Sequence, residues 1–128
     1  MRRMLAIVVL FCVSLMLTSG GAKAQDALKV GPNTHRKLLE NDRVRMLEVT
    51  FAPGDSIGFH SHPDHAVYAV TAGTLRVTTA DGKTQVAALK AGDPIWFPAV
   101  THAAKNIGTT TLKLVVVELK EKPAKSAR

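Results

Sequence analysis

Residues 54–73 read GDSIGFHSHPDHAVYAVTAG and place two histidines, His60 and His62, two positions apart. Side chains two apart on a β-strand leave on the same face, so both imidazoles are expected to point to one side. Their Cα atoms would be about 6.5–7 Å apart, which lets the two rings hold one metal ion. Gly58 is expected on the same face, where it leaves room. Such pairs also occur by chance on solvated strands, so this pair needs a third partner.

A second stretch supplies that partner. Residues 92–106 read GDPIWFPAVTHAAKN, and His102 follows the segment 98–101, which we interpret as a turn that brings the chain back toward the first histidines. A surface position or a hydrogen-bonding role would explain any one of these histidines. All three together favour metal ligation by His60, His62 and His102.

The chain after residue 35 alternates short β-rich runs with turns of Gly, Pro, Asp and Asn. Many short strands at close spacing indicate an all-β sandwich or barrel. No segment after residue 24 keeps a helical period for three turns. The expected strands cover residues 36–40, 43–51, 57–62, 65–72, 75–79, 84–89, 95–97, 102–106 and 111–119. In the last of them Leu112, Leu114 and Val116 should share one face.

With these residues the chain resembles the cupin superfamily. The first family motif runs from a glycine over His-x-His and a glutamate to a second glycine, and it corresponds to residues 54–73. The second motif runs from a glycine over a proline and a histidine to an asparagine, and it corresponds to residues 92–106. The resemblance implies a single-domain cupin-type jelly-roll β-barrel over residues 36–119, of the small type-2, quercetin-dioxygenase-like kind. It also implies a homodimer.

The chain departs from the motif at the glutamate that ligates the metal in the family. Direct counting puts Ala66 at that position, whereas a gap shorter by one residue puts His65 there. Three roles are therefore open for His65: a fourth metal ligand, a residue outside the ligand set that orients the substrate, or a loop residue. The shorter gap also aligns Tyr68 with an aromatic residue common in the family, and we lean toward ligation by His65.

A site made of imidazoles has a distinct chemistry. Neutral ligands leave a divalent ion its full positive charge, so the site should attract anionic chelating molecules such as carboxylates, enolates or thiolates. Three-histidine cupin sites resemble those of dioxygenases that act on thiols or diketones, which favours Fe(II), although Zn, Mn, Cu or Ni would also suit. The sequence predicts a non-haem metal-dependent oxygenase acting on a small anionic molecule. The alternative is a non-catalytic exported module that binds metal or a small ligand.

Other polar residues are expected to have structural roles. His35 should be exposed in a lead-in over residues 25–35, and Arg45 and Arg76 should be solvated on outer strand faces. Asp55 and Asp93 each follow a glycine and should form turns. Asn106 should also lie at a turn or strand end.

The first residues indicate export. Arg2 and Arg3 precede an apolar run over residues 5–18, and Ala22-Lys23-Ala24 has the small-x-small pattern of a signal-peptidase site. The run is short for a bilayer span, which needs about 20 apolar residues. We therefore expect residues 1–24, including Cys12, to be removed. The mature protein should then be periplasmic or secreted and should not be anchored in a membrane.

The charge of the chain does not indicate nucleic-acid binding. Loss of Arg2, Arg3 and Lys23 lowers the net charge from +7 to +4. Much of the remaining basic charge lies near the C-terminus, where residues 120–128 are expected to form a disordered tail. The barrel offers no stripe of alternating aromatic and basic residues, so we expect a small-molecule ligand and no nucleic acid.

The export hypothesis makes a direct prediction. Intact-mass analysis of the protein isolated from its producing cell should give a mature N-terminus at Gln25 in the periplasm or medium. A chain that keeps Met1 in the cytosol would contradict it.

Overall fold

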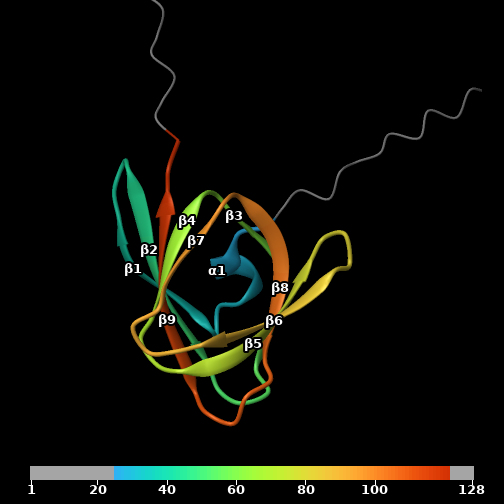
Figure 1. Ribbon diagram of the computed structural model, residues 1–128. Coiled ribbons are helices and arrows are strands. Elements are labelled where there is room, and N and C mark those ends of the chain that lie inside the picture. The colour runs from blue at the N-terminus through green and yellow to red at the C-terminus, as the bar shows by residue number, and fades with distance from the viewer. Residues whose placement is uncertain (1–24, 122–128) are drawn as a thin grey trace, which may run out of the picture.

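The computed structural model describes residues 25–121 as one all-β domain with a short N-terminal helix (Figure 1). The expected signal peptide and most of the expected tail lie outside the described residues. The expected all-β fold is confirmed. The elements are α1 (Ala27–Val30), β1 (His35–Glu40), β2 (Val44–Phe51), β3 (Ser56–His62), β4 (His65–Ala69), β5 (Gly73–Thr79), β6 (Thr84–Leu89), β7 (Pro94–Phe97), β8 (Val100–Asn106) and β9 (Leu112–Leu119).

The strands form two antiparallel sheets. One has the order β1-β2-β9-β4-β7 and the other the order β3-β8-β5-β6. Strands that are distant in sequence are therefore neighbours, as β2 and β9 are along their whole length. This crossing of the chain between sheets places the two histidine-bearing stretches, β3 and β8, side by side, with His60 directly opposite His102.

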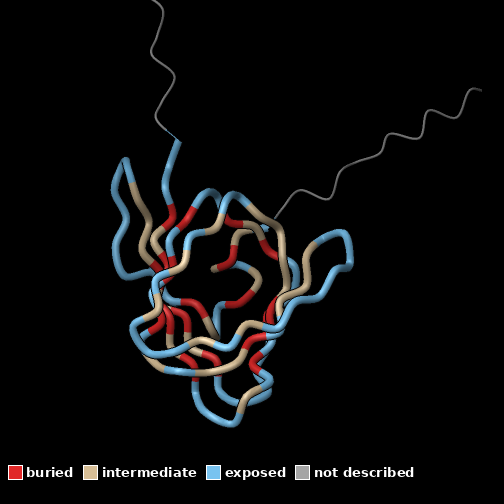
Figure 2. Tube along the Cα trace, viewed as in Figure 1, coloured by how far each residue is buried: buried red, intermediate tan, exposed pale blue. Residues whose placement is uncertain are grey.

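Alternating burial along the strands builds the core between the sheets. In β9 the residues Leu112, Leu114 and Val116 are buried while the residues between them are partly exposed, as the sequence predicted. Figure 2 shows buried positions along the barrel wall and exposed positions at the connecting turns. The buried apolar set is Ala27, Leu47, Val49, Phe51, Ile57, Val67, Ala69, Leu75, Ala104, Leu112, Leu114 and Val116.

A β-bulge in β3 sets the direction of the histidines. Ile57 pairs with Ala104 and His60 pairs with His102, so β3 has one more residue than β8 over this interval. The extra residue lets both Ile57 and His60 face inward, while Gly58 is exposed. The expectation that Gly58 shares the face of His60 is therefore wrong, because the bulge resets the two-residue alternation.

The first residue of each histidine-bearing stretch is a glycine in the left-handed region. Gly54 has φ 87° and Gly92 has φ 92°, a conformation that other residues adopt only with strain. The following aspartates form the turns, as expected. The Asp55 carboxylate accepts a hydrogen bond from the backbone N–H of Ala52 at 2.9 Å, and that of Asp93 accepts one from Lys90 at 2.8 Å.

Asn106 fastens the end of β8 to its surroundings. It is fully buried, and its Nδ2 donates to the carbonyl oxygens of Phe51 and Thr110, both at 2.9 Å. Its Oδ1 accepts a hydrogen bond from the N–H of Gly108. Asn106 thus lies at a strand end, as expected, and satisfies backbone groups that the sheets leave unpaired.

The segment before the barrel packs against it. Asp26 caps α1 by accepting from the N–H of Leu28 at 2.8 Å, and Ala27 is fully buried. The carbonyl of Gln25 accepts a hydrogen bond from Ser61 in β3. This places the N-terminal segment beside the histidines of β3. Within the described residues, no helix has the length and apolar character to cross a membrane.

Candidate metal centre

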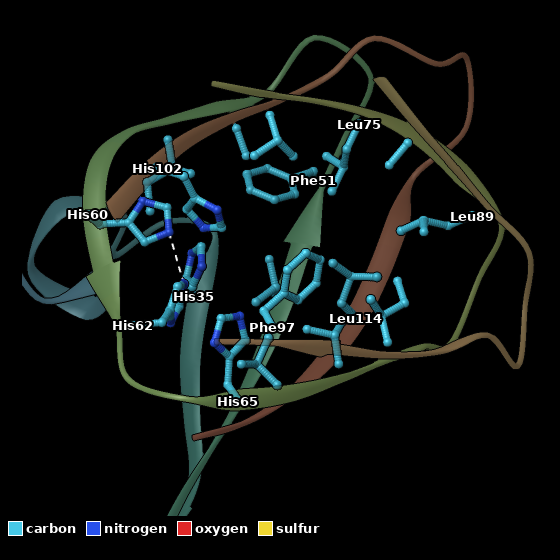
Figure 3. Close-up of a pocket in the computed structure, with 18 residues that line it drawn as sticks. His35, Phe51, His60, His62, His65, Leu75, Leu89, Phe97, His102 and Leu114 are labelled. Carbon is cyan, nitrogen blue, oxygen red and sulfur yellow. Dashed lines mark hydrogen bonds between the residues drawn. The ribbon is translucent and has the colours of Figure 1, made fainter. Parts of the chain in front are cut away.

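All five histidines of the chain line one cavity inside the barrel. They come from β1, β3, β4 and β8 and gather at one end of it (Figure 3). The cavity volume is about 90 Å³. The residues predicted as ligands, His60, His62, His65 and His102, are therefore brought together, and a fifth, His35, joins them.

The side chains of His60 and His62 meet at their Nε2 atoms. These two nitrogens are 3.0 Å apart, and the exposed fractions of the residues are 1 % and 6 %. The other ring nitrogen of each has an acceptor as its partner. His60 Nδ1 lies 2.8 Å from the carbonyl oxygen of Gly58 at the bulge, and His62 Nδ1 lies 2.6 Å from the carboxylate of Glu118. A carbonyl or carboxylate only accepts, so both Nδ1 atoms carry a proton.

This arrangement fits a metal ion. In neutral imidazoles protonated at Nδ1, both Nε2 atoms present lone pairs, and two lone pairs at 3.0 Å repel each other unless a proton or a cation lies between them. Burial lowers the pKa of His60, which disfavours the proton. Two nitrogens that ligate one ion at about 2.1 Å and roughly 90° are themselves about 3.0 Å apart. The geometry and the donor type thus support a divalent metal ion.

His102 faces the same point from β8. Its ring centroid lies 4.7 Å from that of His60 and 5.3 Å from that of His62. When two imidazoles bind one ion and the N–metal–N angle lies between a right angle and the tetrahedral angle, their ring centroids are about 4.5–5.3 Å apart. His102 therefore points into the cavity, as the sequence predicted, but the group whose ligand nitrogens lie within 4.8 Å of one another consists of His35, His60 and His62.

The structure also decides the alignment at the missing glutamate. β4 begins at His65, which is 2 % exposed, whereas Ala66 is exposed on the outer face. The shorter gap is thus correct, and direct counting to Ala66 is wrong. The Nδ1 of His65 lies 2.8 Å from the carbonyl of Pro63, and its ring lies 4.7 Å from that of His62 and stacks on Phe97. Its Nε2 is free to face the cavity.

The expectation that His35 is exposed is wrong. It is 6 % exposed, and the nitrogens that His35, His60 and His62 offer as ligand atoms lie within 4.8 Å of one another. His35 is the first residue of β1 and pairs with the inward-facing Val49, which fixes its direction. The residue that sequence reasoning assigned to a loose lead-in thus belongs to the most compact histidine group of the described chain.

A line of charged groups supports His62 from behind. Glu118 in β9 is 2 % exposed and accepts hydrogen bonds from His62 Nδ1 and Arg45 Nε, both at 2.6 Å. Arg45 Nη1 in turn donates to Asp26 at 2.6 Å. Arg45 is therefore not a solvated outer-face residue, because its side chain is 15 % exposed and pairs with two carboxylates. Sequence reasoning missed Glu118, although it continues the buried alternation of β9.

The side chains of Tyr68, Trp96 and Arg76 lie outside the histidine cavity. Tyr68 and Trp96 are 52 % and 55 % exposed, and neither lines the histidine cavity. Arg76 lies on the exposed face of β5, as expected. The chemistry of the site therefore rests on the histidines and on Glu118 behind them.

Burial disfavours protonation of His35, His60, His65 and His102. Desolvation lowers the pKa of His102 to about 3 and that of His35 to about 4, and the neighbouring charges of His60 and His62 act in the same direction. Burial also lowers the pKa of His65. For Glu118, burial opposes ionisation, but the hydrogen bonds from His62 and Arg45 outweigh it and lower the pKa. These four imidazoles are thus neutral, and the Glu118 carboxylate behind His62 is ionised.

These shifts predict an acid-sensitive metal-free protein. Unfolded histidines take up protons near pH 6.5, whereas His35 and His102 in the folded state do so only near pH 4 and pH 3. The unfolded state then binds more protons as the pH falls through 6.5, so the free energy of unfolding decreases. Thermal unfolding of the chelator-treated protein should give a Tm lower by about 5 °C or more at pH 5 than at pH 7. The variant His102→Leu should flatten this slope, and a Tm independent of pH in this range would contradict the prediction.

Known structures agree with this architecture. The chain is similar to a cupin domain from Bordetella pertussis Tohama I, with 29 % identity, 79 % of this chain and 100 % of that chain covered, and a TM-score of 0.64. It is also similar to the polyketide cyclase RemF from Streptomyces resistomycificus, with 27 % identity, 70 % and 66 % coverage and a TM-score of 0.53. A protein with a double-stranded β-helix domain from Klebsiella pneumoniae has 26 % identity, 69 % and 84 % coverage and a TM-score of 0.54.

The sequence itself matches a family model. No curated protein matches the chain. The model described as a cupin domain matches residues 47–118, which hold both histidine-bearing stretches and Glu118. Because this match covers more than half of the chain and the barrel has the expected strands, the protein belongs to the cupin family.

Proposed function

We propose that this protein is an exported non-haem metal-dependent oxygenase that acts on a small anionic molecule. The observation that carries the proposal is the 3.0 Å contact between the Nε2 atoms of His60 and His62, each held by an acceptor at its Nδ1. The donor set consists of neutral nitrogens, which suit Fe(II) and also Zn, Mn, Cu or Ni. We favour Fe(II), because the family resemblance points to oxygen chemistry.

The histidines would hold the ion and leave its charge uncancelled. His60 and His62 would contribute two nitrogens, with His102, His65 and His35 as the surrounding donors. A redox-active ion in this position supplies Lewis acidity and electron transfer to O₂. No carboxylate lines the cavity in the described chain, so a negative charge must come from the bound molecule. This favours an anionic substrate that binds the ion directly.

The alternative is a non-catalytic module that binds metal or a small ligand. The observation that favours it is the number of histidines, since five imidazoles in one cavity could fill every position around an ion. Catalysis needs at least one open position, whereas storage needs none. The number of nitrogens that bind the ion therefore separates the two functions.

The first experiment tests the oxygenase directly. Elemental analysis of the untagged mature protein should find a stoichiometric transition metal, and the Fe(II)-loaded protein should consume O₂ with a panel of small carboxylates, enols and thiols. The variant His60→Ala should lose metal and activity, whereas Tyr68→Ala, an exposed position outside the cavity, should keep both. Stoichiometric metal without O₂ consumption on the panel would favour the binding module.

A second experiment tests His65. We expect His65→Ala to weaken metal affinity by about tenfold or more in a calorimetric titration, because its ring lies 4.7 Å from His62 and its Nε2 is free. His35→Ala, measured alongside, shows whether the N-terminal histidine also ligates. Unchanged affinity in His65→Ala, with altered ligand binding, would make His65 a residue that orients the substrate and would leave more open positions for catalysis.

Glu118 gives a third test. Its carboxylate holds the Nδ1 proton of His62, so Glu118→Gln should lower metal affinity by about 10–100-fold. Glu48→Gln is the matched control, since Glu48 pairs with Arg36 on the outer side of the same sheet. Equal affinities for the two variants would show that Glu118 does not support the metal site.

A further inference from the structure

The cavity beyond the histidines is apolar throughout. Each of its other lining residues is an aliphatic residue or a phenylalanine. In the described chain, no Ser, Thr, Asn, Gln, Lys, Arg, Asp or Glu lines it. The set comprises Val49, Phe51, Ile57, Val67, Leu75, Val77, Ala87, Leu89, Ile95, Phe97, Ala104, Leu114 and Val116. The cavity therefore has one polar end, made of imidazoles, and one apolar end.

Part of the apolar end is lined by strands at the edges of the two sheets. β6 and β7 are edge strands, and their lining residues Ala87, Leu89 and Ile95 are partly exposed, whereas Phe97 stacks on His65 at the histidine end. Figure 3 shows Leu89 across the cavity from His60. A ligand that enters between β6 and β7 would thus pass apolar side chains before it reaches the imidazoles.

We propose that the site selects a small monoanionic amphiphile with one metal-binding head and a short apolar tail. This inference rests on the proposed function, because the head needs the metal ion beside His60 and His62. A second charged or strongly polar group would be buried among apolar side chains with no partner, which is costly. The cavity volume of about 90 Å³ limits the tail to a few carbon atoms.

Ligand series of defined length test this selectivity. The probe is the Co(II)-loaded protein, whose absorption spectrum reports binding at the ion without turnover. The ligands are straight-chain monocarboxylates from acetate to octanoate. The controls are the α,ω-dicarboxylates of equal carbon number from succinate to adipate, because oxalate and malonate would chelate the ion with both carboxylates. Affinity should rise about threefold to fourfold with each methylene that enters the apolar end, and then fall once the cavity is full. Each dicarboxylate should bind at least tenfold more weakly than its monocarboxylate.

Two variants and one control test whether the apolar tail of the ligand lies in this cavity. Ala87 faces inward opposite the buried Leu75, so Ala87→Phe should narrow the cavity and weaken hexanoate binding by tenfold or more. Ala88→Phe, the exposed neighbour on the same strand, should not. Leu89→Ala should move the best chain length up by one or two carbons. Uptake of Co(II), measured separately, should be the same in all three variants.

The outcomes separate this inference from the proposed function. If Co(II) binds but affinity is independent of chain length, or if dicarboxylates bind as well as monocarboxylates, the substrate class is wrong while the metal site stands. If Ala87→Phe and Ala88→Phe behave alike and Leu89→Ala causes no shift, the tail does not lie in this cavity. If no Co(II) binds, the proposed function fails and the inference falls with it.

Discussion

The contact between the Nε2 atoms of His60 and His62 is the constraint around which the barrel is arranged. Two neutral nitrogens at 3.0 Å repel each other, so their positions must be imposed by the surrounding fold. The bulge in β3 turns His60 inward and offers the Gly58 carbonyl to its Nδ1. Glu118 in β9, which belongs to the other sheet, accepts a hydrogen bond from the Nδ1 of His62. The pair is therefore held from both sheets at once.

Support for His62 extends to the N-terminal segment. Glu118 would be costly to bury as an isolated anion, and Arg45 compensates it with a hydrogen bond at 2.6 Å. Arg45 is shared with Asp26, which also caps α1. One line of ionic contacts thus joins the cap of α1, β2 and β9 to an imidazole in β3. The same N-terminal segment leads into His35, so it contributes both a donor and part of the support.

Much of this site could be predicted from the sequence, and the failures have physical causes. The motif spacing gave His60, His62 and His102, and the strand bounds from alternation lie close to the observed ones. Gly58 was placed on the wrong face because a bulge adds one residue and reverses parity. His35 was missed because its direction comes from pairing with Val49, a long-range contact that composition does not reveal. Glu118 and Arg45 resembled ordinary surface charges, since their mutual burial depends on which strands are neighbours.

Among residues 25–121 no carboxylate lines the cavity, and this connects the metal site with the apolar wall. A ligating glutamate would cancel one unit of the ion's charge and would also bring a polar group into the cavity. Here His65 takes that position, and the carboxylate of Glu118 lies behind His62 and is shared with Arg45. A cation held by neutral nitrogens in a low-dielectric space attracts an anion strongly, because little else screens its charge. In the proposed function, this replacement leaves the bound molecule to neutralise the ion, and we infer that the apolar wall selects among the anions that can bind.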